Sequence, residues 1–299
     1  MKNKLIVGTI QMTCNDNRHE NQLKIERKIK KLANENIDLI VLQELHDSLY
    51  FCQTEDVKQF DMAQELPGQA TQFYSMLAKK HNVVLVASLF EKRTAGLYHN
   101  TAVVFEKNGS IAGIYRKMHI PDDPGYYEKF YFAPGDLGFE PIKTSVGILG
   151  VMICWDQWYP EAARIMALKG ADILIYPTAI GYDFKDSEEE RKTQLNSWKT
   201  IQKSHAIANG IPLICVNRSG VEISENSKNK IHFWGNSFVC DPQGKTLYQA
   251  DEIEESGITT ILMNQSEKVR RNWPFLRDRR IEEYYEIQKR FIDHKEGLF

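Results

Sequence analysis

The chain has 299 residues, of which 42% are hydrophobic and 26% are charged, a composition typical of a folded globular protein. Lys and Arg total 38 and Asp and Glu total 40, so the net charge of −2 lacks the basic excess of a nucleic-acid-binding protein. The N-terminus shows no signal-peptide pattern, and the longest apolar run, residues 146–155, is about half a membrane span. Five cysteines without a CxxC pair argue against a disulfide framework or a zinc site. We therefore expect a cytoplasmic protein that binds neither nucleic acid, nor a membrane, nor a metal.

Apolar strand patterns alternate with helical patterns along the chain. Strands are predicted at residues 5–12, 38–45, 83–90, 101–107, 110–117, 146–154, 171–179, 212–218, 235–241 and 257–264. Helices are predicted at residues 19–35, 70–81, 159–169 and 189–209. Asn108-Gly109 and residues 241–244 predict hairpin turns. These elements indicate an α/β fold with helices outside the sheets, although periodicity alone does not distinguish one sheet from two packed sheets.

The last part of the chain differs from the rest, because basic and aromatic residues alternate there. Its apolar positions fit one helical face and include Ile281, Tyr284, Tyr285, Ile287, Phe291 and Ile292. Such a helix could cover its own domain or a partner subunit. We therefore divide the chain into a domain over residues 1–265 and a tail over residues 266–299, which we expect to be helical and to lie at a subunit interface.

Three residues with reactive side chains each end an apolar strand. Glu44 and Lys117 do so, and Cys154 closes its strand just before a helix that opens near Pro160. In α/β folds such positions lie at a sheet edge where substrates bind. The backbone N–H groups of the turn after Cys154 can lower the pKa of its thiol or hold an oxyanion. Taken singly, each residue is more simply explained as a surface glutamate, a solvated lysine or a buried structural cysteine.

The segment after Lys117 is broken by prolines and a glycine and is rich in aromatic residues, so we predict an irregular loop. It also contains His119 and Glu128. An irregular aromatic loop with these polar side chains is typical of an active-site wall.

The three strand ends carry the motifs LIVLQEL, YRKMHIP and GVMICWDQWYPEAAR. In this order and at these separations the motifs resemble the nitrilase superfamily of carbon–nitrogen hydrolases, over residues 4–265. The stretches KMHIPD-x-PGYYEKFYF, ICWDQWYPEAAR and YPTAIG resemble the N-carbamoylputrescine amidohydrolases within it. The resemblance implies a four-layer αββα sandwich of two packed β-sheets, paired with a second subunit as a homodimer or larger homo-oligomer.

The resemblance also implies roles for four side chains. Cys154 would be the nucleophile, Glu44 the general base and acid, Lys117 the oxyanion stabiliser and Glu128 a second glutamate beside this triad. Chemistry agrees, because a thiol with a pKa of ~8.5 is mostly protonated at pH 7 and needs a base. The backbone N–H of Trp155 can be a second donor to the oxyanion. Such a reaction needs no metal or organic cofactor.

The substrate implied by the resemblance is a carbamoylated diamine, N-carbamoylputrescine. Its hydrolysis through a cysteine thioester would give putrescine, CO2 and ammonia, a step of polyamine biosynthesis. The aromatic side chains expected to hold its methylenes and ammonium are Tyr126, Tyr127, Trp155 and Trp158. Asp183 is the candidate carboxylate for the ammonium, whereas Asp156 is expected to cap the following helix.

Other interpretations stay open. A β-ureidopropionase, another N-carbamoyl amino-acid hydrolase or an aliphatic amidase has the same superfamily pattern, and an amino-acid substrate would call for an arginine such as Arg164. A cysteine–histidine hydrolase using His119 or His205 is a poorer fit, because a lysine and a glutamate already serve the needed roles. A non-catalytic subunit that kept the fold is a different class, and the complete set of reactive residues argues against it.

Overall fold

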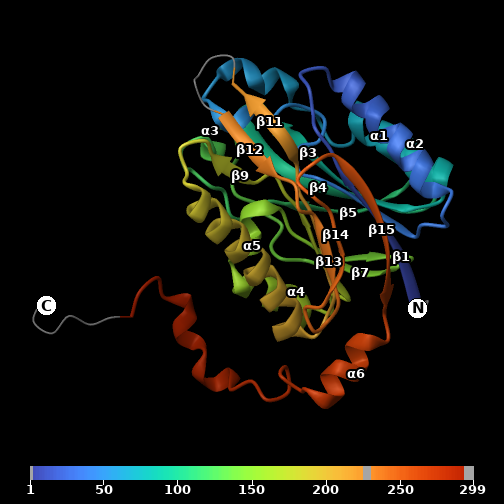
Figure 1. Ribbon diagram of the computed structural model, residues 1–299, viewed down its shortest axis with the longest axis vertical. Coiled ribbons are helices and arrows are strands. Elements are labelled where there is room, and N and C mark those ends of the chain that lie inside the picture. The colour runs from blue at the N-terminus through green and yellow to red at the C-terminus, as the bar shows by residue number, and fades with distance from the viewer. Residues whose placement is uncertain (1–2, 225–229, 293–299) are drawn as a thin grey trace, which may run out of the picture.

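The computed structural model describes residues 3–224 and 230–292, and its first sheet has six strands. They are β1 (Lys4–Gln11), β2 (Leu39–Leu42), β3 (Val84–Thr94), β4 (Leu97–Phe105), β5 (Ile111–Arg116) and β15 (Glu255–Leu262), in the order β15-β1-β2-β3-β4-β5. Strands β1, β2 and β3 run parallel, and the other pairs are antiparallel. Helices α1 (Arg18–Ala33) and α2 (Gln69–His81) form the parallel crossovers and cover the outer face (Figure 1).

The second sheet also has six strands. They are β6 (Ile142–Thr144), β7 (Gly147–Val151), β8 (Ile173–Pro177), β10 (Leu213–Val216), β13 (Phe238–Cys240) and β14 (Thr246–Gln249), in the order β14-β13-β10-β8-β7-β6. Helices α4 (Pro160–Leu168) and α5 (Glu188–Asn209) lie on the side of the molecule opposite α1 and α2 (Figure 1). The predicted four-layer αββα sandwich is therefore confirmed, as are both hairpin turns, which join β4 to β5 and β13 to β14.

Alternation along the buried strands explains the layering. Leu39 and Val41 pack in the core between the two sheets, whereas Ile40 and Leu42 pack under α1 and α2. All four side chains are almost completely buried. Burial of a side chain of this size contributes about 1.5–3 kcal/mol, so strands that are apolar on both faces stabilise the two inner layers.

A small third sheet was not predicted from the sequence. Its strands β9 (Gly181–Asp183), β11 (Ser219–Ile223) and β12 (Lys230–Trp234) are short and antiparallel, in the order β11-β12-β9. It lies close to the short helix α3 (Glu128–Tyr131), which forms inside the loop predicted to be irregular (Figure 1). These elements build a wall above the ends of the main strands.

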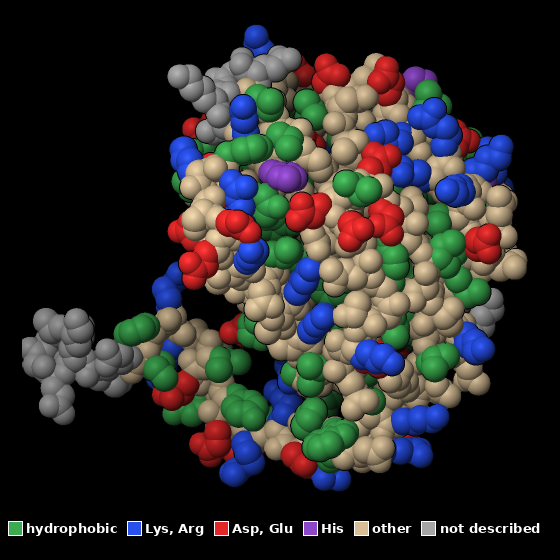
Figure 2. Space-filling model, viewed as in Figure 1, with side chains coloured by type: hydrophobic (Ala, Val, Ile, Leu, Met, Phe, Trp, Pro, Cys, Tyr) green, Lys and Arg blue, Asp and Glu red, His purple; other side chains and the backbone are tan. Residues whose placement is uncertain are grey.

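The tail is helical only in part. Helix α6 (Gln265–Asn272) follows β15, and two short 3-10 helices, Ile281–Glu283 and Tyr285–Gln288, replace the single amphipathic helix that we expected. The segment runs away from the body of the molecule (Figure 1), and Figure 2 shows its apolar side chains mixed with charged ones. The last seven residues of the predicted tail, 293–299, lie outside the described residues.

Within residues 3–224 and 230–292, no helix is both long enough and apolar enough to cross a bilayer.

Candidate active site

Glu44 follows β2 and is completely buried, with two oxygens in different surroundings. Its Oε1 accepts hydrogen bonds from Asn100 Nδ2 at 2.7 Å and from Lys117 Nζ at 2.8 Å. Its Oε2 is buried without a hydrogen-bond partner among the described residues. A buried carboxylate oxygen without a donor is energetically costly, so Oε2 is poised to interact with a proton or a ligand.

The backbone after Glu44 is strained and held in place. Leu45 has a φ of +47°, in the left-handed region that residues with a Cβ rarely adopt. Nη2 of the buried Arg218 donates to the carbonyl oxygens of Glu44, at 3.1 Å, and Leu45, at 2.7 Å. Nη1 of Arg218 also forms an ion pair with Glu222 at 2.6 Å. Strain of this kind persists only where the surroundings enforce it.

Lys117 follows β5, and its ammonium lies between two carboxylates. Nζ is 2.8 Å from Glu44 Oε1 and 2.6 Å from Glu128 Oε2, and all three side chains are buried. Burial opposes the charge, but the two carboxylates outweigh this effect and hold the pKa of Lys117 well above its usual value. An ammonium has three N–H groups, so one remains for a ligand.

Glu128 opens α3 and closes this buried cluster. Its Oε1 accepts a hydrogen bond from the hydroxyl of Tyr50 at 2.7 Å. Burial and the nearby negative charge of Glu44 raise the pKa of Glu128 to about 7, although Lys117 acts in the opposite direction. Two carboxylates share one cation here, so Glu128 can hold a proton near neutral pH.

Cys154 sits in a sharp turn that follows β7. Its φ is +45°, and it begins the 3-10 helix Cys154–Trp158. The carboxylate of Asp156 holds this turn, because it accepts hydrogen bonds from the backbone of Ile153 at 2.9 Å, the backbone of His119 at 3.0 Å and the hydroxyl of Tyr115 at 2.8 Å. Asp156 therefore does not cap α4 as expected. It fixes the residue that presents the thiol.

Backbone N–H groups of the turn could have lowered the pKa of the Cys154 thiol, but this pKa is raised well above its usual value. Burial is the main cause, and the negative charges of Glu44 and Glu128 add to it while Lys117 opposes them. The charged groups of Glu44, Lys117 and Glu128 therefore all act on this thiol. A thiol in this setting is protonated at rest, so its proton must leave during the attack.

A cavity of about 440 Å³ opens onto Cys154. Its aromatic wall is formed by Tyr126, Trp155, Trp158 and Trp234, and its polar wall by Asp123, Asp183, Asp186, Thr193, Gln194 and Ser197. No lysine, arginine or histidine of the described residues lines it. Tyr127 does not line it either, and its backbone N–H donates to the carbonyl of Cys52 at 2.8 Å.

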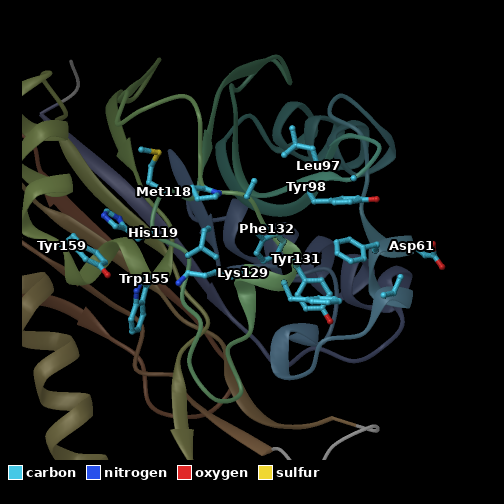
Figure 3. Close-up of a pocket in the computed structure, with 17 residues that line it drawn as sticks. Asp61, Leu97, Tyr98, Met118, His119, Lys129, Tyr131, Phe132, Trp155 and Tyr159 are labelled. Carbon is cyan, nitrogen blue, oxygen red and sulfur yellow. The ribbon is translucent and has the colours of Figure 1, made fainter. Parts of the chain in front are cut away.

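A larger groove of about 970 Å³ lies beside this cavity, but it does not reach Cys154. Figure 3 shows Trp155 and Tyr159 at one end of the groove and Tyr98 and Asp61 at the other. The ring of His119 stacks on Tyr159 with centroids 3.7 Å apart. Trp155 lines both spaces, so the groove and the cavity share one wall.

Several residues that complete the site were missed from the sequence. Arg218 directly follows the apolar run of β10, so the signal that identified Glu44 and Lys117 could have identified it. Asn100 lies inside β4 and Tyr50 in a loop, and neither position carries such a signal. Their importance comes from long-range contacts that only the fold creates.

We expect Glu128 to make stability depend on pH. Its folded-state pKa of about 7 lies above the ordinary value of 4.5, so its protonation stabilises the fold fully below pH 4.5. This stabilisation is lost as the pH rises through 7. We compare the free energy of unfolding of the wild type with that of Glu128→Gln at each pH. The excess of the wild-type value over the variant's should fall by about 3 kcal/mol between about pH 4.5 and pH 8.

Chemical denaturation at a series of pH values measures this difference. Glu35→Gln, at an exposed glutamate, is the matched control and should keep the wild-type dependence. A flat difference between wild type and Glu128→Gln would contradict the assigned proton.

Comparison with known proteins identifies the family. The model of the carbon-nitrogen hydrolase family matches residues 6–271. The chain is 40% identical to a citrullinase from Francisella tularensis, over 95% of this chain and 98% of the relative. It is 39% identical to an N-carbamoylputrescine amidase from Oryza sativa subsp. japonica, over 94% of this chain and 93% of the relative. A crystal structure of a carbon-nitrogen hydrolase from Helicobacter pylori G27 superposes with a TM-score of 0.95 at 55% identity, covering 97% of this chain and 100% of that chain. The chain therefore belongs to the carbon–nitrogen hydrolase family of the nitrilase superfamily.

Proposed function

We propose that this protein hydrolyses N-carbamoylputrescine to putrescine, CO2 and ammonia. The observation that carries the proposal is the cavity in front of Cys154, which has three aspartates and, among the described residues, no cationic side chain. Such a cavity favours a substrate whose far end is an ammonium. The relatives named N-carbamoylputrescine amidase, at 38–39% identity, support the same assignment.

The first half of the reaction forms a thioester. Oε2 of Glu44 takes the thiol proton as Sγ of Cys154 attacks the ureido carbon, and this proton later leaves with ammonia. The third N–H of Lys117 stabilises the negative charge that develops on the ureido oxygen, with the backbone N–H of Trp155 as a second donor. The carbon–nitrogen bond to the terminal NH2 breaks, and the remaining carbamoyl group stays on sulfur.

The second half releases the product. Glu44 removes a proton from water, which attacks the thioester carbon, and Sγ leaves and regains a proton. The released carbamate then breaks down to CO2 and putrescine. Glu128 holds the far side of the Lys117 ammonium, at 2.6 Å, and keeps it in position through both halves.

The ammonium of the substrate fits the polar end of the cavity. Tyr126 and Trp158 offer aromatic faces to the methylenes and the cation. Asp183 is a weaker partner than expected, because it is half exposed and lies 4.0 Å from Lys185 Nζ. Asp186 also lines the cavity and accepts a hydrogen bond from Gln194 at 3.3 Å. We therefore assign Asp186 the larger share of the interaction with the substrate ammonium.

Citrulline is the second candidate substrate, because the relative from Francisella tularensis is named citrullinase. It offers the same ureido group and an ammonium, but it also has a carboxylate. No described cation lines the cavity to receive that carboxylate, and Arg164 lies on α4 away from it. N-carbamoyl amino acids that lack an ammonium fit less well still.

We also propose that the protein forms a homodimer or a larger symmetric oligomer. The tail exposes apolar side chains that a monomer would leave in water, with exposed fractions of 68% at Ile281, 64% at Tyr285 and 77% at Phe291. A second copy of the chain is the simplest surface to cover them.

Replacing the nucleophile should stop the reaction. Cys154→Ser should abolish turnover without unfolding the protein, because an alkoxide is much harder to form than a thiolate. Iodoacetamide should label Cys154 before Cys14, Cys52, Cys215 and Cys240, since the Cys154 thiol opens onto the cavity. Peptide mass spectrometry measures the order of labelling. Equal labelling of the five cysteines would favour a non-catalytic subunit, and turnover by the serine variant would contradict the assignment of Cys154 as the nucleophile.

The substrate panel tests the charge of the cavity. We expect kcat/KM for N-carbamoylputrescine to exceed that for N-carbamoyl-β-alanine by at least ~1000-fold, because a carboxylate would be buried without a partner. N-carbamoylcadaverine should be a detectable but poorer substrate, since one methylene is worth ~1–3 kcal/mol. Ammonia release at one pH, with citrulline included, gives these values.

Two variants sharpen this panel. Asp186→Asn should raise KM for N-carbamoylputrescine, whereas Glu189→Gln, at an exposed position in the first turn of the helix α5 that follows Asp186, should not. A preference for citrulline or for the β-alanine derivative would replace the proposed substrate.

Removing the tail should affect the proposed homo-oligomer. Deletion of residues 278–299 should weaken self-association, because it removes most of the exposed apolar side chains of the segment. Light scattering at micromolar concentration measures the mass of both forms. A full-length chain that is monomeric under these conditions would contradict the oligomer and leave the tail as a solvated segment.

A further inference from the structure

Four neighbouring strands of the first sheet deliver polar side chains to the same end of the sheet. Glu44 follows β2, Ser88 lies in β3, Asn100 in β4, and Lys117 follows β5. All four are completely buried. The two outer members carry the reaction proposed above, whereas Ser88 and Asn100 have no part in it so far.

The hydrogen bonds of Ser88 fix the orientation of Asn100. The Ser88 hydroxyl accepts from the backbone N–H of Leu45 at 3.1 Å, so its own proton is free to be donated. It donates that proton to Oδ1 of Asn100 at 3.2 Å. With Oδ1 engaged as an acceptor, the amide nitrogen of Asn100 must point the other way, which is toward Glu44.

The chain of donors closes on itself. It starts at the N–H of Leu45, passes through Ser88 and Asn100, and ends 2.7 Å away on Oε1 of Glu44, the residue before Leu45. The backbone of Lys117 is tied to the same point, because its N–H donates to the carbonyl of Asn100 at 2.9 Å. Every link has one direction, so the carboxylate has one favoured orientation.

We propose that Ser88 and Asn100 are positioning residues that engage Oε1 of Glu44 and so dedicate Oε2 to proton transfer. This inference rests on the proposed role of Glu44 as the base, but not on the identity of the substrate. Without the Asn100 amide, Lys117 would be the only described donor to the carboxylate, and the group could rotate about its last bond. The proton acceptor would then spend part of its time turned away from the thiol.

A positioning role and a purely structural role predict different effects. A positioning role slows the transfer of the Cys154 proton to Oε2 of Glu44, whereas a purely structural role lowers the stability of the fold and leaves that step unchanged.

Alkylation of Cys154 by iodoacetamide tests the proposal without any substrate. Asn100→Leu should lower the alkylation rate by ~10- to 100-fold, the range for lost hydrogen bonds to charged groups. Ser88→Ala removes a single oxygen and frees the amide to turn, so it should lower the rate by ~3- to 10-fold. With the substrate that the panel identifies, kcat should fall while KM stays unchanged.

The matched control is Thr101→Val on the same strand. Thr101 is buried and donates to Oε2 of Glu91 at 2.5 Å, outside the site, so its loss should reduce stability but leave the alkylation rate within ~2-fold. In a Glu44→Gln background, Asn100→Leu should cause no further loss. A wild-type alkylation rate in Asn100→Leu and Ser88→Ala, or an equal loss in the Glu44→Gln background, would overturn the proposal. Ser88→Ala keeps the test valid if Asn100→Leu does not fold.

Discussion

The site depends on one buried ammonium held between two carboxylates. Lys117 contacts Glu44 at 2.8 Å and Glu128 at 2.6 Å, and none of the three side chains is open to water. Removing Lys117 would leave buried carboxylate charge without its cation, and an uncompensated buried charge costs about 3–5 kcal/mol. Burial and the carboxylates of the cluster raise the pKa of the Cys154 thiol, and burial and Glu44 raise that of Glu128, while Lys117 keeps one N–H for a ligand. The proposed acid, base and oxyanion roles would thus come from a single electrostatic arrangement.

The fold keeps this arrangement in place from several sides. Strand ends of both sheets meet there, and the Glu44 N–H reaches the carbonyl of Thr178, just after β8, at 3.4 Å. Arg218 holds the strained backbone after Glu44, and Asp156 holds the turn at Cys154. Leu45, which follows Glu44, and Cys154 itself both have a positive φ, and each is held by a buried charged side chain.

Much of this could be predicted from the sequence, and the limits are physical. Among the fifteen strands of the described residues, apolar runs located ten. The other five, β6, β9, β11, β12 and β14, are each partly exposed, so no continuous apolar run marks them in the sequence. The strand-end motifs predicted where Glu44, Lys117 and Cys154 lie. Asn100 and Tyr50 could not be found, because their partners are 56 and 78 residues away in the chain. The raised pKa of the Cys154 thiol could not be predicted either, because burial and the carboxylates around the turn are properties of the folded structure.

The central claim is that Lys117 and Glu44 act on the reaction itself. Single-turnover ammonia release from N-carbamoylputrescine by Lys117→Ala and Glu44→Gln, with enzyme in excess, tests it most directly. The account predicts that each variant loses at least ~100-fold in rate, the usual effect of removing an oxyanion donor or a general base, while circular dichroism shows an intact fold. A folded Glu44→Gln variant that released ammonia at close to the wild-type rate would contradict the account, and the base would then have to be Glu128.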